Sequence, residues 1–159
     1  MNNLSRVVQR LIEKNVEFVL VGGFAAAAHG SPLGTQDVDV CCPMTFENLS
    51  RIQSALEGLH PMHRSRPDLP LEITPKFCEG LKNLYLKTDH CALDCLGTVL
   101  GVGDYETVRQ HVIELKLPYG VCPVLDLDTL IAAKVAMGRQ HDIETVVHLK
   151  QIKNRLSKA

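Results

Sequence analysis

The segment EFVLVGGFAAAAHGSPLGTQDVDVCC, residues 17–42, carries most of the information about the fold. Its first five residues form an apolar run of strand length that ends at Gly22-Gly23. The alanine-rich stretch that follows favours a helix, which Gly30 can end. Turn-forming residues then lead to VDVCC, residues 38–42, which predicts a second strand. The segment therefore predicts a strand, a Gly-Gly turn, a short helix and another strand.

The flanking sequence extends this pattern in both directions. Upstream, Leu4, Val7, Val8, Leu11 and Ile12 have the spacing of an amphipathic helix. Downstream, Thr45 can cap a helix that reaches Leu59, and the proline-rich residues 60–76 predict a loop or a partly ordered arm. The remaining predictions are a hairpin over 83–97, a turn and a short helix over 101–111, a hairpin over 112–125, and helices over 127–138 and 140–156. We therefore expect an α+β fold with a mixed β-sheet and helices packed mainly on one face.

Composition narrows the classes of protein that fit. The 159 residues predict a single domain, 1–159. Seventeen Lys and Arg against eighteen Asp and Glu give no global reason to bind nucleic acid or an acidic membrane. The aromatic content of 4%, without Trp, argues against a row of base-stacking rings. No apolar run spans a membrane and the N-terminus is not a signal peptide, so we expect a cytoplasmic protein.

Six cysteines occur without any CxxC pair, and most lie in apolar stretches. Reduced, buried thiols are the expected state, with a metal site or a disulfide framework as the alternative.

Asp37 and Asp39 are the first candidates for chemistry. Side chains two apart on a strand share a face, with a backbone separation of ~6.6 Å. At a separation of ~5 Å, two carboxylates repel by about 3 kcal/mol at an effective dielectric constant of ~20. A cation removes this cost, so the pair is able to hold Mg²⁺. The alternative is a solvated acidic strand edge.

Two further features fit an anion and a cation near this pair. Gly22 and Gly23 precede a helix, where glycine allows a phosphate to approach backbone N–H groups. Asp94 lies in the apolar strand CALDCLG, residues 91–97, where an unpaired carboxylate is costly to bury. A metal shared with the other two aspartates would compensate its charge, and a buried salt bridge is the alternative.

Lys134 lies on the apolar face of the helix predicted over 127–138. A lysine at such a position either extends its amine to solvent or reaches an anion in a cleft. Arg139, His141 and Asp142 follow within two turns. They either bind phosphate or close the turn between the last two helices.

Four segments together resemble the DNA polymerase beta-like nucleotidyltransferase superfamily. They are VLVGGFAAAAHG, TQDVDV, CALDCLG and LIAAKVAMGRQHD, and the resemblance covers most of residues 17–147. It is nearest to small single-domain prokaryotic members, some of which modify antibiotics or act as toxins of toxin–antitoxin pairs.

The resemblance implies transfer of a nucleoside monophosphate from a nucleoside triphosphate such as ATP to a hydroxyl acceptor, with two Mg²⁺ ions, Mn²⁺ being an alternative. Asp37 and Asp39 would hold both ions, and Asp94 would complete the ion that activates the acceptor and help to deprotonate it. The implied nucleotide-binding residues are Gly22, Gly23, Thr35, Lys134 and Arg139.

One position departs from the family pattern. Many small members have Arg two residues before the Thr of the TxDxD motif, and this chain has Leu33. Lys134 or Arg139 would then have to supply the cation that faces the phosphates. His29 is expected to serve as a capping or core residue, with a catalytic role as the less favoured alternative.

The sequence leaves the acceptor open among RNA, a protein and a small molecule. The acceptor would bind through residues 60–76, a second copy of the chain in a homodimer, or a partner protein. The tail KQIKNRLSK, residues 150–158, either meets RNA phosphates or forms a solvated helix face. Two alternatives to an active enzyme are a nucleotide-binding module with weak transfer, which Leu33 favours, and an interaction subunit of a larger complex.

Overall fold

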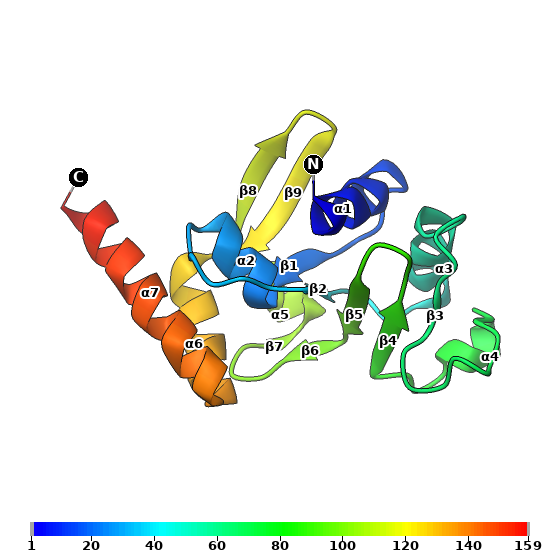
Figure 1. Ribbon diagram of the computed structural model, residues 1–159. Coiled ribbons are helices and arrows are strands. Elements are labelled where there is room, and N and C mark those ends of the chain that lie inside the picture. The colour runs from blue at the N-terminus through cyan, green and yellow to red at the C-terminus, as the bar shows by residue number, and fades with distance from the viewer. Residues whose placement is uncertain (1, 159) are drawn as a thin grey trace.

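The computed structural model describes residues 2–158 and contains a seven-stranded mixed sheet (Figure 1). The strand order is β3-β4-β5-β2-β1-β9-β8. The pairs β2–β5 and β1–β9 are parallel, and the others are antiparallel. The strands are β1 (Val19–Val21), β2 (Asp37–Cys41), β3 (Met62–His63), β4 (Asn83–Lys87), β5 (Ala92–Leu96), β8 (Val112–Leu117) and β9 (Gly120–Leu125). A separate ribbon pairs β6 (Thr98–Val99) with β7 (Gly103–Asp104).

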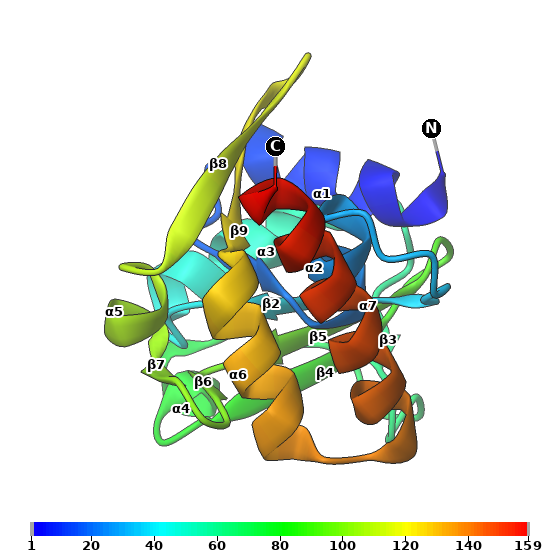
Figure 2. The same ribbon diagram turned by 90° about the vertical axis from the view of Figure 1, so that its left-hand side faces the viewer.

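Two of the helices begin at side-chain caps that the sequence indicated. Thr45 accepts a hydrogen bond from the N–H of Asn48, and Asp126 accepts one from the N–H of Thr129. In Figure 2, α6 and α7 run side by side in front, with α1 and α3 behind them. The helices are α1 (Asn3–Glu13), α2 (Gly22–Ala28), α3 (Phe46–Ala55), α4 (Pro75–Cys78), α5 (Tyr105–Val108), α6 (Leu127–Met137) and α7 (Gln140–Ser157). None of these helices is both long and apolar enough to cross a membrane.

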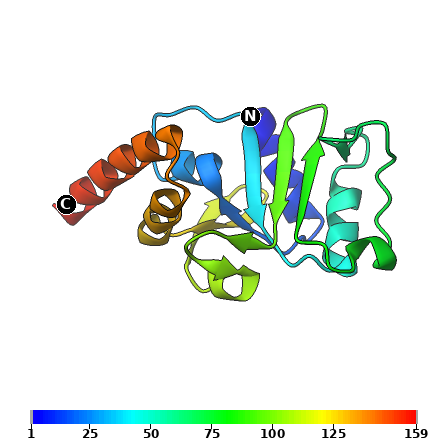
Figure 3. The ribbon, with the colours of Figure 1, turned by 90° about the horizontal axis from the view of Figure 1, so that it is seen from below.

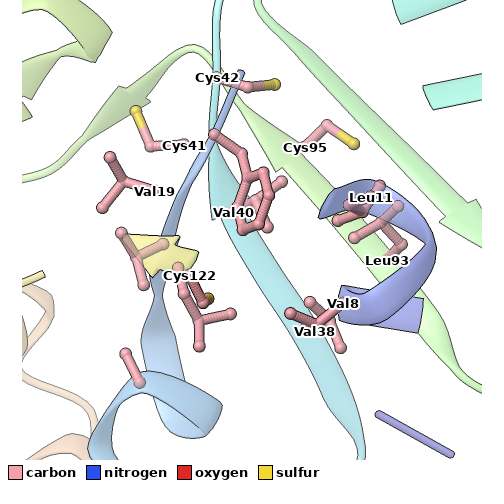
Figure 4. Close-up of a cluster of buried hydrophobic side chains, with 14 of the residues drawn as sticks. Val8, Leu11, Val19, Val38, Val40, Cys41, Cys42, Leu93, Cys95 and Cys122 are labelled. Carbon is pink, nitrogen blue, oxygen red and sulfur yellow. The ribbon is translucent and has the colours of Figure 1, made fainter. Parts of the chain in front are cut away.

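Burial alternates along β2 and β5, so one face of these two strands packs into the core on the side of α1. Val38 and Val40 of β2 are fully buried and pack with Leu93 of β5 against Val8 and Leu11 of α1 (Figure 4). The residues between them point to the other face. The alternation therefore places Asp37, Asp39 and Asp94 together on the face away from α1.

The α+β fold with a mixed sheet is confirmed, and residues 60–76 are more ordered than predicted. Met62 and His63 form an edge strand on β4, and Thr74 caps the short helix α4. A two-residue strand has no periodicity to detect, which explains the difference. All six cysteines are free thiols, so the disulfide alternative is wrong.

Candidate active site

The three aspartates meet because of the register between neighbouring strands. Asp39 of β2 lies directly beside Asp94 of the parallel strand β5. On the outer side, Tyr85 of β4 lies opposite Asp94, and on the inner side Val21 of β1 lies opposite Asp39. Figure 3 shows β2, β5 and β4 side by side. Asp37 lies two residues earlier on the same face, so the structure brings all three predicted carboxylates together.

Burial and mutual repulsion disfavour the charged forms of two of these groups. Burial, together with the charges of Asp94 and Asp37, raises the pKa of Asp39 to about 6. Burial also raises the pKa of Asp94, although the nearby guanidinium of Arg64 acts in the opposite direction. In both groups the effect of burial outweighs the nearby positive charge, which is Lys134 for Asp39 and Arg64 for Asp94.

Arg64 is a site residue that the sequence did not reveal. Its Nη1 lies 2.8 Å from Oδ1 of Asp94, and its guanidinium lies 5.2 Å from the centre of the Tyr85 ring. Its backbone N–H also donates to the carbonyl of Tyr85, which extends the edge of the sheet. The position lies in the proline-rich segment and 30 residues from Asp94, so no local pattern could have paired the two.

Oδ1 of Asp94 remains unsatisfied despite this ion pair. The oxygen is buried, and no hydrogen bond reaches it from residues 2–158 because the guanidinium N–H groups are not directed at it. A buried carboxylate oxygen that receives no directed hydrogen bond and lies beside a second carboxylate fits the preference of Mg²⁺ for oxygen ligands. Asp37, Asp39 and Asp94 would hold the ion.

The cation site is nevertheless not preassembled. Within the described part of the chain, no three carboxylate, imidazole or thiol groups lie close enough together to hold a metal ion. Asp94 is paired with the guanidinium of Arg64 instead.

The two glycines allow the β1–α2 turn to lie against the predicted site. Gly22 has φ +72°, and a Cβ at this position would overlap Oδ2 of Asp39. A Cβ on Gly23 would come within 2.9 Å of Oγ1 of Thr35. Thr35 in turn donates a long hydrogen bond of 3.4 Å to the carbonyl of Asp37. The turn therefore brings both glycines and Thr35 next to the carboxylates.

Lys134 and Arg139 are brought together by Asp142. This carboxylate is fully buried, and it accepts hydrogen bonds from Nζ of Lys134 at 3.3 Å and from Nε of Arg139 at 2.7 Å. It also caps α7 by accepting from the N–H of Arg139 at 3.2 Å. Asp142 thus closes the turn and holds both cations, which is the structural role considered for this segment.

A cavity of about 300 Å³ lies between the β1–α2 turn, Asp39 and the two cations held by Asp142. Its polar wall comes from Gly22, Asp39, Lys134 and Arg139, and its apolar wall from residues that include Leu100 and Met137. The charge of Lys134 acts to lower the pKa of Asp39, but burial and the neighbouring carboxylates outweigh it. The volume falls at the lower end of the range for small-molecule sites. Thr35, Asp37 and Arg64 line a neighbouring cavity of about 670 Å³.

The remaining candidates lie outside these contacts. Nε2 of His29 lies 2.8 Å from the carbonyl of Leu125, so this side chain joins α2 to the end of β9. His29 therefore has the structural role that the sequence favoured. Leu33 is half-buried, and Ser31 accepts a hydrogen bond from its N–H.

Comparison with known proteins supports the fold. No family model matches the sequence, and no curated protein matches it. Among solved structures, the chain is similar to a "putative nucleotidyltransferase" from Thermotoga maritima, with a TM-score of 0.57 and 17% sequence identity. The likeness covers 98% of this chain and 91% of the other. The chain therefore has a nucleotidyltransferase-like fold.

Proposed function

We propose that this chain is a metal-dependent nucleotidyltransferase that moves a nucleoside monophosphate from a nucleoside triphosphate to a hydroxyl acceptor. The observation that carries the proposal is the row formed by Asp39 and Asp94, with Gly22 packed against Asp39. Asp39 lines a cavity that two cationic side chains, Lys134 and Arg139, also line. A triphosphate needs these three features: oxygen ligands for a metal, close backbone approach and fixed positive charge.

Different residues of the site would bind the metal, accommodate the phosphates and position the cations. Asp37, Asp39 and Asp94 would hold Mg²⁺, which when bound neutralises phosphate oxygens and polarises the acceptor hydroxyl. Gly22 and Gly23 would leave room for the phosphates, and Lys134 and Arg139, which line the same cavity as Gly22, would face their charge. Asp142 keeps both cations in place.

In the reaction, the acceptor oxygen forms a bond to the α-phosphorus as the bond from that phosphorus to the bridging oxygen of the β-phosphate breaks. Pyrophosphate leaves with the bonding electrons. The proton of the acceptor passes to Asp94 as the general base.

A thermal-shift experiment tests nucleotide binding without knowledge of the acceptor. ATP, GTP, CTP and UTP are each added with Mg²⁺ and with EDTA to the wild type and to the variant Asp37→Asn/Asp39→Asn. A ligand at ~100 times its Kd adds about 2.7 kcal/mol to the free energy of unfolding. For a chain of this size, this raises the Tm by several degrees.

Asp68→Asn is the matched control, since this carboxylate pairs with Arg66 in an exposed loop. We expect a metal-dependent shift in the wild type and the control, and none in the double variant. Transfer is then tested with α-labelled triphosphate and candidate acceptors, and Asp39→Asn is expected to abolish it. Equal transfer by wild type and Asp39→Asn would refute the proposal.

The ion pair between Arg64 and Asp94 favours a second candidate, a nucleotide-binding module with weak transfer. The guanidinium occupies the carboxylate that would otherwise serve the acceptor. We expect Arg64→Gln to increase the affinity for Mg²⁺ up to about fivefold, the equivalent of a pair worth ~1 kcal/mol. Arg66→Gln, which removes the same charge from the exposed loop, is expected to leave Mg²⁺ affinity unchanged. Calorimetric titration without nucleotide measures both.

A further inference from the structure

A second, cationic groove leads away from the carboxylates on the side opposite the cavity that contains Lys134. The groove begins in the cavity of about 670 Å³, where Asp37 and Thr35 lie with Arg64 and Lys87. His90 lines this cavity and also lines the next one, of about 440 Å³. The second cavity contains Arg6, Arg10 and Lys14 of α1. The two cavities therefore lie next to each other on either side of His90, with Asp37 in the wall of the first.

The fold explains how distant segments form this groove. In Figure 1 and Figure 3, the start of α1 lies near the start of β2 and the turn that joins β4 to β5. The β4–β5 turn carries His90, and Lys87 lies at the end of β4. The face of α1 opposite its buried Val7, Val8 and Leu11 is free to carry charge.

The cations on α1 form a regular series. Arg6, Arg10 and Lys14 are four residues apart, so they lie along one stripe of the helix. Their backbones are separated by about 6 Å along the axis. This repeat is close to the separation of successive phosphates in an extended single strand of nucleic acid.

Most of this charge is not compensated by the protein. No carboxylate within residues 2–158 forms a salt bridge with Arg6, Lys14 or Lys87. Arg10 is held by the carbonyls of Ala55 and Glu57 at the end of α3, which makes it the fixed point of the series.

Two acids near the groove are already engaged by neutral or cationic neighbours. Glu13 lines the second cavity and accepts a hydrogen bond from Gln9. The carboxylate of Asp89, beside His90, lies 2.6 Å from the imidazole of His60. Asp37, at the start of the groove, is the carboxylate that remains there.

The lining favours a phosphodiester chain over a peptide. Ala55 is the one apolar residue among those that line the second cavity, and it is buried. A peptide bound in an extended groove needs apolar pockets for its side chains, and this second cavity offers mainly charged and amide side chains instead. Cationic side chains spaced along a groove are the usual means of following a nucleic-acid backbone.

We propose that this groove binds the 3′ end of a single-stranded nucleic acid, RNA in the first place, and directs its terminal hydroxyl to Asp37 and the neighbouring carboxylates. The inference rests on the proposed function, because it names the acceptor of that transfer. The nearly balanced net charge of the chain is compatible with RNA binding, because the local series of cations along α1 creates a positive electrostatic potential at the groove.

Equilibrium binding tests the groove without any turnover. A fluorescently labelled single-stranded RNA of twelve nucleotides is titrated with the full chain, in the absence of triphosphate and metal, over a range of salt concentrations. Arg6→Ala/Lys14→Ala removes two exposed charges and none of the contacts that hold α1 in place. Since each phosphate contact contributes about 0.7 to the salt slope for single strands, we expect the slope to fall by about 1.4 and affinity to fall on the order of tenfold at 0.1 M salt.

Lys116→Ala/Lys150→Ala is the matched control, because these exposed lysines lie on β8 and α7, away from the groove. We expect it to bind RNA like the wild type. Circular dichroism verifies that both double variants are folded. Equal affinity of the groove variant and the wild type would overturn the proposal, and so would an equal loss in the control.

Competitors separate the classes of ligand. Unlabelled RNA is expected to displace the probe, and polyglutamate of equal charge is not. Effective displacement by polyglutamate would overturn the nucleic-acid assignment in favour of an acidic peptide. Displacement of the probe by DNA as well as by RNA would support the proposal that the groove binds the phosphodiester backbone. Asp39→Asn is expected to bind the RNA normally, so failure of transfer and failure of the groove give different results.

Discussion

The backbone at Gly22, which follows β1, lies very close to the side chain of Asp39 on β2. The positive φ of Gly22 and the overlap that a Cβ would have with Asp39 both require glycine. Gly58 also has a positive φ, +83°, but nothing lies within 4 Å of its Cβ position. Alanine at Gly58 would therefore introduce backbone strain alone, whereas alanine at Gly22 would also crowd the side chain of Asp39.

We expect Gly58→Ala to lower the free energy of unfolding by about 1–2 kcal/mol through strain alone. Gly22→Ala is expected to lower it further and to displace Asp39, so that the Mg²⁺-dependent thermal shift by triphosphate disappears. Urea unfolding and the thermal-shift experiment measure the two effects. A Gly22→Ala variant that keeps the nucleotide shift would contradict the role assigned to this close packing.

Asp39 makes the free energy of unfolding depend on pH. Its pKa is about 6 in the folded chain and near 3.8 when unfolded, so the folded state binds the proton more tightly. The stabilisation by this group is complete below pH 4 and is lost as the pH rises through 6. At pH 7, without metal, Asp39→Asn should therefore be more stable than the wild type by about 1–3 kcal/mol.

Urea unfolding in EDTA at pH 4 and pH 7 measures this difference. We expect no gain from Asp39→Asn at pH 4, where the wild-type carboxyl is already neutral. Asp68→Asn, in the exposed loop, is the control and is expected to show no gain at pH 7. An equal effect of Asp39→Asn at both pH values would show that repulsion among the carboxylates is not the cause.

At the scale of elements, the α6–α7 hairpin depends on one buried charge. Burial acts to raise the pKa of Asp142, but hydrogen bonds from Arg139 and the charge of Lys134 outweigh it, and the pKa is lowered. Asp142→Asn would leave the ammonium of Lys134 buried without a counter-charge. Loss of one partner of a buried pair costs about 3–5 kcal/mol.

We therefore expect Asp142→Asn to lower the free energy of unfolding by about this amount. Asp128→Asn, which removes an exposed partner of Lys153 from the same helix, is expected to cost under ~1 kcal/mol. The lowered pKa also means that the stabilisation by Asp142 is present above pH 4 and is lost as the pH falls further. Denaturant titration of both variants at pH 7 measures the contrast, and similar losses would refute it.

Elements with a clear period or cap were predictable from the sequence. The helices that follow Thr45 and Asp126 and the hairpin of β4 with β5 have such signals, and the structure confirms them. Strand β3 has only two residues, and it is defined by its antiparallel pairing with β4 at the edge of the sheet. Nothing within its own sequence indicates that pairing.

At the scale of the whole molecule, the same limit applies to the candidate site. The alternation in β2 predicted that Asp37 and Asp39 share a face, and the structure places them so. The contacts of Arg64 with Asp94 and of Asp142 with Lys134 depend on how edges and helices pack. Such contacts join positions without a fixed sequence spacing, so the sequence supplied the residue types but not the pairs.

The two cavities on either side of the carboxylates give the final prediction. Residues 21–22, 98–100 and 133–139 contribute walls of the cavity of about 300 Å³, whereas residues 6–14 and His90 line the cationic groove. Ligands of the two sites should therefore slow amide hydrogen exchange in different segments, because ordering is local to the bound surface.

We expect triphosphate with Mg²⁺ to slow exchange several-fold in 21–24, 98–100 and 133–139, and to leave 3–14 unchanged. Single-stranded RNA should slow exchange in 3–14 and 88–91, and leave 133–139 unchanged. Triphosphate with EDTA is the control and should protect none of these segments. Exchange measured by mass spectrometry on the full chain resolves them all. Protection of the same segments by both ligands would mean that one cavity serves both, because two separate sites on either side of the carboxylates require two separate footprints.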